Sequence, residues 1–382
     1  MYGMGVVVAP IVGPTLGGWI TDNYSWNWIS LINIPVGILP LFLTSMLVHD
    51  PPFLRRTSLK DGARIDFIGL GLLTTGLGFL EIALDEGQRN DWFTSNLILA
   101  SAVIAVVALV SVVLWELNHK DPVVDFRLLK DRNFAVSTLN MFALGFVLYG
   151  STTALPLFLQ SLLGYTAMQS GMALSPGGVV IMLLMPVVGM LLAKIEARWL
   201  IIFGLLISSG GLFLMTSFDL QIAFSDAVWA RIVQSLGLAF LFVPINTIAF
   251  AVIAKEKTSY ATGLINLARN VGGSTGIAII TTMLSRRSQY HQQVLVGHLT
   301  PYDPTYQGAL QGIATRLTQQ GVNAVEAASK AQGMIYGMVQ RQAAMLAFID
   351  IFWVLGVTFV SLIPLILLLR RVKPSHGPVI AE

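Results

Sequence analysis

The strongest constraint on this chain is a succession of apolar runs, each long enough to cross a lipid bilayer as a helix. A spanning helix needs about 20 apolar residues. Runs of that order lie at 3–20, 28–48, 66–86, 96–116, 135–159, 171–193, 199–217, 227–253, 263–284 and 345–369. Only 11% of the 382 residues are charged and 55% are hydrophobic, which leaves too few charges to cover a globular surface. Since lipid offers no partner to a free backbone N–H or C=O, we predict an all-α polytopic membrane protein with ten transmembrane helices.

Lysine and arginine are concentrated in every second connection between these runs. Fifteen of the 23 lie near 51–65, 117–134, 194–198 and 254–258 and after 369. The alternate short connections, near 21–27, 87–95, 161–170 and 218–226, carry only Arg89. Cytoplasmic loops of membrane proteins are enriched in these residues. We therefore predict a multi-pass protein of the cell's inner (cytoplasmic) membrane, with both ends of this chain on the cytoplasmic side.

The composition excludes several classes of function. The chain has no cysteine, so it forms no disulfide and holds no metal through thiolates. Its net charge of +3 is small and gives no footprint for nucleic acid. All five histidines fall in connections or tails, and no nucleophile elbow or phosphate-binding loop occurs. We predict no enzyme activity, no cofactor, no metal site and no nucleic-acid partner.

One outer connection, 285–344, is far longer than a turn. Apolar residues in 306–320 and 323–341 recur at the spacing of short amphipathic helices. Two interpretations stay open: a solvated helical cap, or a docking surface for an extracytoplasmic partner.

Arg231 lies near the start of the span 227–253 and is followed by Gln234. An intramembrane arginine needs a carboxylate, backbone carbonyls or a water-filled cavity, and a carboxylate partner has to come from another helix. We interpret Arg231 as part of a transport cycle; the alternative is an anchor at the outer interface.

Polar residues on the span 263–284 recur at steps of three and four. Asn266, Arg269, Asn270 and Gly273 therefore share one helix face, which suits the protein interior better than lipid. We expect this face to look inward, with the glycines admitting a neighbouring backbone. For Arg269, the alternative is a side chain that reaches the cytoplasmic interface.

Two further spans carry candidate substrate contacts. Asn140, Phe146 and Tyr149 combine amide and aromatic groups in the span 135–159, as a cavity for large amphipathic molecules requires; ordinary packing is the alternative. Asn246 follows Pro244 in mid-membrane, where it lines the path or satisfies a carbonyl that the proline leaves free.

The acidic residues of the spans have separate expected roles. Asp66 precedes an apolar run, the position of a helix N-cap. Glu81 and Asp85 lie at an outer helix end, where solvation at the interface competes with a proton site. Asp350, in the last span, is the best candidate for protonation or for pairing with an arginine.

The first span contains APIVGPTLGG at 9–18. Glycine and proline are costly inside a spanning helix unless it bends and packs at backbone distance. The pattern resembles the antiporter signature of the major facilitator superfamily: Gly13, Pro14, Gly17 and Gly18 match in register, while Ala9 replaces a glycine.

The residues downstream sharpen the resemblance. Trp26 and Trp28, then Asn33, Pro35 and Gly37, resemble the segment that follows the signature in EmrB/QacA-type drug:proton antiporters. Near the start of the span 227–253, Arg231, Gln234 and Gly237 resemble the superfamily's R-x-x-Q-G-x-G helix motif, with serine in place of one glycine. The segment 189–198 resembles a degraded copy of a conserved family loop that has lost its acid.

The resemblance covers essentially the whole chain and implies a major facilitator fold of fourteen spans, of which the first four are missing here. Residues 1–50 would be the last two helices of the N-terminal bundle, 51–133 two inserted helices with linkers, and 134–382 a C-terminal six-helix bundle that includes the loop 285–344. The resemblance further implies alternating access around a midplane cavity, with amphipathic drugs moving out and protons moving in.

In a protein of this family, the antiporter motif would close the contact between the two bundles and so prevent leak across the membrane. Asn140, Phe146, Tyr149, Asn246, Asn266 and Asn270 would line or support the substrate path, and Arg231, Arg269 and Asp350 would serve coupling. A periplasmic membrane-fusion adaptor would be a further partner.

Two other function classes stay open. One is a membrane scaffold or sensor that docks a periplasmic adaptor through 285–344 without transporting. The other is a membrane transferase for lipid-linked substrates, which the lack of an acidic metal-binding pair on a loop disfavours.

Overall fold

A computed structural model describes residues 2–47, 66–119, 122–300 and 302–370, with side chains from residue 13 onward except that of Lys255. These residues form helices and connections without a strand. The helices are α1 (Tyr2–Asn23), α2 (Asn27–Leu31), α3 (Asn33–Leu47), α4 (Phe67–Glu86), α5 (Asn96–Asn118), α6 (Arg132–Leu163), α7 (Ala167–Leu192), α8 (Ala197–Met215), α9 (Phe224–Ala251), α10 (Thr258–Gly297), α11 (Pro304–Gln319) and α12 (Ala324–Leu367). Short 3-10 turns occupy Trp92–Thr94 (η2), Phe126–Lys130 (η3) and Lys255–Lys257 (η4). The predicted all-α class is confirmed.

Every predicted apolar run coincides with a helix, and the run 28–48 is divided between α2 and α3. Eight helical segments of the described part are long and apolar enough to span a membrane. They are α2 and α3 taken together as one segment, each of α4 to α9, and α12. α1 and α10 fall outside that set. Each nevertheless packs lengthwise on spanning helices, α1 on α7 and α10 on α6 and α12. Ten spans therefore stays a prediction.

The helices α6 to α10 and α12 form one bundle with a continuous apolar core. Phe158, Phe218, Phe348 and Phe352 stack edge and face inside it. Along the α6–α10 contact, Gly145 meets the backbone of Arg269, and Gly272 and Gly276 meet the backbones of Phe142 and Phe146. A side chain at any of these glycines would collide with main chain, so α6 and α10 pack at backbone distance.

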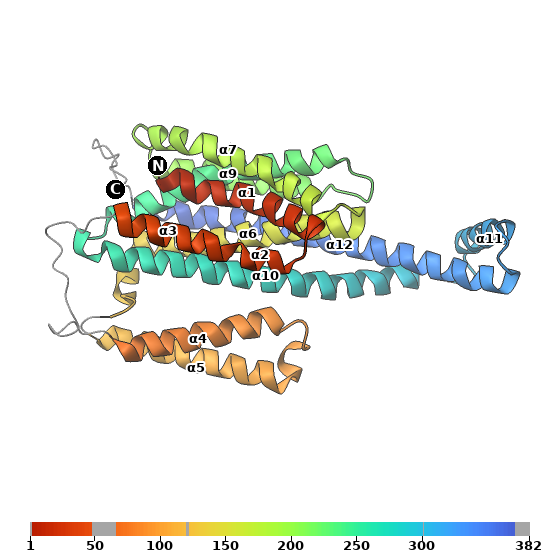
Figure 1. Cartoon of the computed structure of the whole chain (residues 1–382), viewed down its shortest axis with the longest axis horizontal. Coiled ribbons are helices and arrows are strands. Elements are labelled where there is room, and N and C mark those ends of the chain that lie inside the picture. The colour runs from red at the N-terminus through yellow and green to blue at the C-terminus, as the bar shows by residue number, and fades with distance from the viewer. Residues whose placement is uncertain (1, 48–65, 120–121, 301, 371–382) are drawn as a thin grey trace.

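The helices α4 and α5 form a separate hairpin that lies beside α10 (Figure 1). They pack on each other where Gly76 meets Leu109. Asp66 caps α4, because its Oδ1 accepts a hydrogen bond from the Gly69 backbone N–H at 2.8 Å. The predicted N-cap is confirmed.

The two ends of the molecule differ in charge and in how far the helices extend. The α7–α8 and α9–α10 connections and the segment before α6 carry Lys194, Lys257, Arg127 and Lys130; we call this the cationic end. At the opposite end, α10 and α12 continue far past the bundle and carry α11 at their tip (Figure 1). We call α10 beyond residue 284, α11, and α12 before residue 345 the helical extension.

The helical extension corrects the expected boundaries of the outer connection. The span 263–284 does not end at residue 284, because α10 continues to Gly297. The helix expected at 323–341 is not separate from the last span, because α12 runs unbroken from Ala324 to Leu367. Helical periodicity continues across both boundaries with no glycine turn or proline to interrupt it, so the change in polarity marks the edge of the apolar zone rather than the end of a helix.

Candidate functional site

The most deeply buried charge in the described bundle is Arg231 of α9, whose exposed fraction is 6%. Its Nη1 donates to Gln234 Oε1 at 2.8 Å and to Ser151 Oγ at 3.1 Å. Its Nη2 donates to Thr152 Oγ1 at 3.1 Å, and Gln234 Nε2 donates to Ser151 Oγ at 2.8 Å. The guanidinium is thereby bound to α6 through neutral oxygens, and none of the described ion pairs includes it.

This solvation differs from the carboxylate, carbonyl or cavity expected for Arg231. Two hydroxyls and one amide replace water, and the Nε atom is buried without a partner. α7 closes the third side: a methyl group on Gly177 would lie 3.2 Å from Arg231 Cγ. A buried cation without a counter-charge costs free energy. The contact of α6, α7 and α9 at Arg231 therefore carries an electrostatic cost.

The candidate path residues of α6 point in different directions. Asn140 and Phe146 are buried, with 1% and 9% exposed, and Asn140 Nδ2 donates to the Val136 carbonyl at 2.8 Å. Tyr149 is 41% exposed, and its ring covers Gly273 of α10. Of these three side chains, only Tyr149 is open at a surface of the bundle.

The polar face expected on α10 is divided. Gly272 and Gly276, rather than Gly273, admit the neighbouring backbone. Asn266 and Asn270 are exposed, and Asn270 faces α4 across a cavity of about 160 Å³ that Glu81 and Ser274 also line. Residues spaced three or four apart do not lie exactly above one another on a straight helix. Over two turns, the predicted face therefore includes one side that is packed and one side that is exposed.

Two other predicted residues find partners of their own. The Arg269 guanidinium lies over the ring of Phe242, 5.8 Å from its centroid. Asn246 Nδ2 donates to the Phe242 carbonyl at 2.8 Å, within its own helix. That carbonyl is not the one four residues before Pro244, so Asn246 does not fill the gap that the proline leaves.

Asp350 of α12 pairs with α10, whereas the Arg231 cluster joins α9 to α6. Its Oδ2 accepts from Arg287 Nε at 2.6 Å and lies 2.7 Å from His291 Nε2. Arg287 also stacks on Tyr290 at 4.8 Å. Neither Arg287 nor His291 was among the predicted site residues; their spacing of four residues would have placed them on one face, had the predicted helix continued past residue 284.

The antiporter motif of α1 faces α7. A methyl group on Gly18 would lie 2.5 Å from the Ala167 carbonyl oxygen, and Gly171 of α7 meets the backbone of Pro14. Thr15 and Ser175 exchange a short hydroxyl hydrogen bond in the same contact. A methyl group on Gly13 or Gly17 would have nothing within 4 Å of it. Half of the predicted motif is therefore packed, and half is open.

Asp22 completes this contact at the end of α1. Its Oδ2 accepts from the backbone N–H of Met168 at 2.8 Å, in the first turn of α7. This hydrogen bond lowers the pKa of the Asp22 carboxyl below its ordinary value. An acid of one helix thus occupies the positive end of another.

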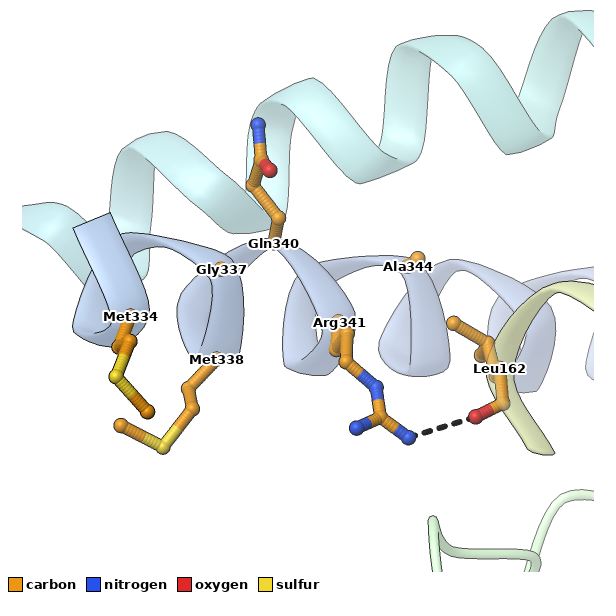
Figure 2. A pocket seen from close by; sticks show the side chains of 7 residues that line it. All are labelled: Leu162, Met334, Gly337, Met338, Gln340, Arg341 and Ala344. Carbon is orange, nitrogen blue, oxygen red and sulfur yellow. Dashed lines mark hydrogen bonds between the residues drawn. The ribbon is translucent and has the colours of Figure 1, made fainter. Parts of the chain in front are cut away.

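The helical extension carries a groove of about 510 Å³ where α12 passes the end of α6 (Figure 2). Met334 and Met338 point into it from successive turns of α12. Arg341 Nη2 donates to the Leu162 carbonyl at 2.7 Å and so caps the end of α6. Flexible methionine side chains suit an adaptable contact surface.

Comparisons with known proteins place the sequence in a family. Residues 1–277 match the family model described as Major Facilitator Superfamily. The fatty acid resistance protein FarB of Neisseria gonorrhoeae is 34% identical over 379 residues, covering 99% of this chain and 71% of that protein. The multidrug export protein EmrB of Escherichia coli K12 is 34% identical over 382 residues, with the same coverage. A solved bacterial homolog to the human lysosomal transporter Spinster overlaps more loosely, with a TM-score of 0.44 and 16% identity over 94% of this chain and 81% of that one.

Proposed function

The chain belongs to the major facilitator superfamily, as an EmrB-type member, and from this premise we propose that it exports amphipathic molecules across the cytoplasmic membrane in exchange for protons. Family membership indicates a multi-span membrane transporter. The names of its relatives, a multidrug export protein and a fatty acid resistance protein, support amphipathic substrates.

The observation that carries the proposal is the close contact between α1 and α7. Alternating access requires two bundles that part and rejoin along tightly fitting helices. Gly18 and Gly171 let the two backbones approach, while Thr15 and Asp22 add polar contacts that break and re-form without burying charge. This combination favours a moving seal over a permanent core contact.

The substrate path would follow the open polar surface of α6 and α10. Tyr149, Asn266 and Asn270 are exposed there, whereas Asn140 and Phe146 support the path from behind. Arg231 would act through Ser151 and Thr152, by fixing how α9 sits on α6. Arg269, Asn246 and Asp350 remain candidate coupling or path residues.

Orientation follows from charge. The cationic end would face the cytoplasm with both ends of the chain, and the helical extension would stand in the periplasm. There the groove lined by Met334 and Met338 would receive a membrane-fusion adaptor. Site-specific photocrosslinking from position 338, with Tyr302 on the exposed tip as the control position, tests this contact.

The test of export is uptake of a cationic dye into inverted vesicles that contain the gene product. We expect accumulation that an uncoupler abolishes, because the proton gradient drives exchange. Dye that accumulates equally in vesicles without the protein would contradict export. Adaptor crosslinking without any dye movement would favour the scaffold instead.

A further inference from the structure

Two buried carboxyl groups meet at the cationic end of the α4–α5 hairpin. Asp66 is 7% exposed and Glu116 is 1% exposed. A methyl group on Gly69 would lie 2.5 Å from Asp66 Oδ2 and 2.5 Å from Glu116 Oε1. These two oxygens are therefore no more than about 5 Å apart, close enough for two carboxylates to repel each other strongly.

Asp66 is surrounded by donors that stabilise its charged form. The Gly69 backbone N–H donates to Oδ1 at 2.8 Å, and Trp115 Nε1 lies 3.1 Å from Oδ1 and 2.9 Å from Oδ2. Burial pushes the pKa of Asp66 upward, but these hydrogen bonds outweigh it, and the pKa lies below the ordinary value. Asp66 is the ionised member of the pair.

Glu116 is held on one side only. Its Oε2 accepts from the Val123 backbone N–H at 2.9 Å, whereas its Oε1 is buried and has no hydrogen-bond partner. A buried oxygen without a partner costs free energy, and a charged one facing another carboxylate costs more. A proton on Glu116 removes its charge, and with it the repulsion between two buried carboxylates.

We propose that Asp66 and Glu116 hold one proton between them at neutral pH, carried by Glu116. Gly69 is the residue that makes room for this pair, since any side chain there would separate the two oxygens. The proton site lies outside the Arg231 cluster and outside the α1–α7 contact, and it does not rest on the proposed export function.

One described basic group acts on the pair: a charged His119 attracts both carboxylates and so favours their ionised forms. Among the described residues near the pair, His119 stacks on Trp115 at 5.7 Å, and Arg127 donates to the Leu117 and His119 carbonyls. Asp125 is neutralised by Lys257 at 2.8 Å. Among the described ion pairs, none includes Asp66 or Glu116.

The site links protonation to the attachment of the hairpin. Glu116 holds Val123, in the segment that leads from α5 to α6, and Asp66 holds the first turn of α4. Loss of the proton places two like charges face to face and pushes these segments apart. The hairpin is thereby sensitive to pH at the cationic end.

The direct test is infrared difference spectroscopy of the purified full-length gene product in lipid nanodiscs. At about pH 7, ordinary carboxyl groups are ionised, and we expect a buried carboxylic C=O band in the parent protein. Glu116→Gln should abolish the band, and Asp66→Asn should shift its frequency, because Glu116 then no longer lies beside a carboxylate. Glu86→Gln, at the other end of α4, should leave it unchanged.

A second measurement separates a proton from a structural effect. As pH rises, the parent should lose the proton and its apparent Tm should fall by about 3 °C or more. Glu116→Gln keeps the amide N–H in place of the O–H, so its Tm should not respond to this titration. A band that survives Glu116→Gln would overturn the proposal. So would the absence of a band at every pH, or a Tm that depends on Na⁺ instead of pH.

Discussion

Gly171 of α7 lies directly against the backbone of Pro14 of α1, and this contact joins helices that are more than 140 residues apart in the chain. The two backbones can approach there because Gly171 has no side chain to separate them. Thr15 and Ser175 lie next to this point on the same two helices.

The first prediction concerns the glycines of this contact. Gly18→Ala and Gly171→Ala should weaken α1–α7 packing by about 1–3 kcal/mol, because the new methyl groups collide with backbone atoms. The chain has no cysteine, so Thr15→Cys combined with Ser175→Cys forms a clean disulfide reporter. We expect slower crosslinking in both alanine variants.

Gly13→Ala and Gly17→Ala are the matched controls, because open space surrounds both positions. They should crosslink at the parent's rate. Equal slowing in all four variants would show that helix flexibility, rather than packing, governs the contact.

The second prediction concerns pH at the end of α1. Because the Met168 N–H lowers the pKa of Asp22, its contribution to α1–α7 packing is complete above the ordinary carboxyl pKa and is lost as pH falls through the lowered value. Crosslinking of the same reporter pair should therefore decline in acid.

In Asp22→Asn, crosslinking should be weaker at neutral pH and should lose this acid dependence. Asp219→Asn alters an exposed acid on another turn and serves as the control. A parent-like acid response in Asp22→Asn would assign the effect to other groups.

The third prediction concerns Arg231. Arg231→Lys keeps the charge but cannot contact Ser151, Thr152 and Gln234 in one plane, since an ammonium lacks the guanidinium fork. Losing one or two such hydrogen bonds, at about 1.5 kcal/mol each, should reduce dye transport by about tenfold or more.

Arg316→Lys, on the exposed face of α11, should transport at the parent's rate. Parent-like transport by Arg231→Lys would reduce the role of Arg231 to its charge alone.

The fourth prediction concerns Asp350. Asp350→Asn removes the negative charge between Arg287 and His291, so α10 and α12 should separate where the helical extension begins. Hydrogen–deuterium exchange around residues 285–297 should increase.

Glu326→Gln is the control, because its pair with Lys330 is more than half exposed and contributes little. If exchange is unchanged in Asp350→Asn, apolar packing rather than the ion pair holds the two helices together.

Much of the fold could be predicted from the sequence because apolar length and the Gly-Pro pattern act locally. The helix at each apolar run, the cap at Asp66 and the close packing around Gly18 all follow from residues within a few turns. The continuation of α10 and α12 could not be predicted from hydropathy, which changes where the apolar zone ends while the helix continues.

The site was harder to predict because its partners come from distant helices. Ser151 and Thr152 satisfy Arg231 across 80 and 79 positions, and Arg287 meets Asp350 across 63. Two hydroxyls and an amide take the place of the carboxylate, carbonyls or cavity considered from the sequence, and they engage both Nη atoms while Nε stays without a partner. The spacing of residues within one helix could not predict partners that lie on another helix.

The unbroken course of α12 has a mechanical consequence. The helix has 44 residues, and its only internal proline, Pro364, lies near the cationic end. The portion in the helical extension is about 30 Å long at 1.5 Å per residue. A rigid rod of that length is a lever: a tilt of about 10° at the bilayer displaces its tip by about 5 Å. Any rocking of the bundle is thus amplified at α11, where another protein could sense the state of the transporter without touching the membrane.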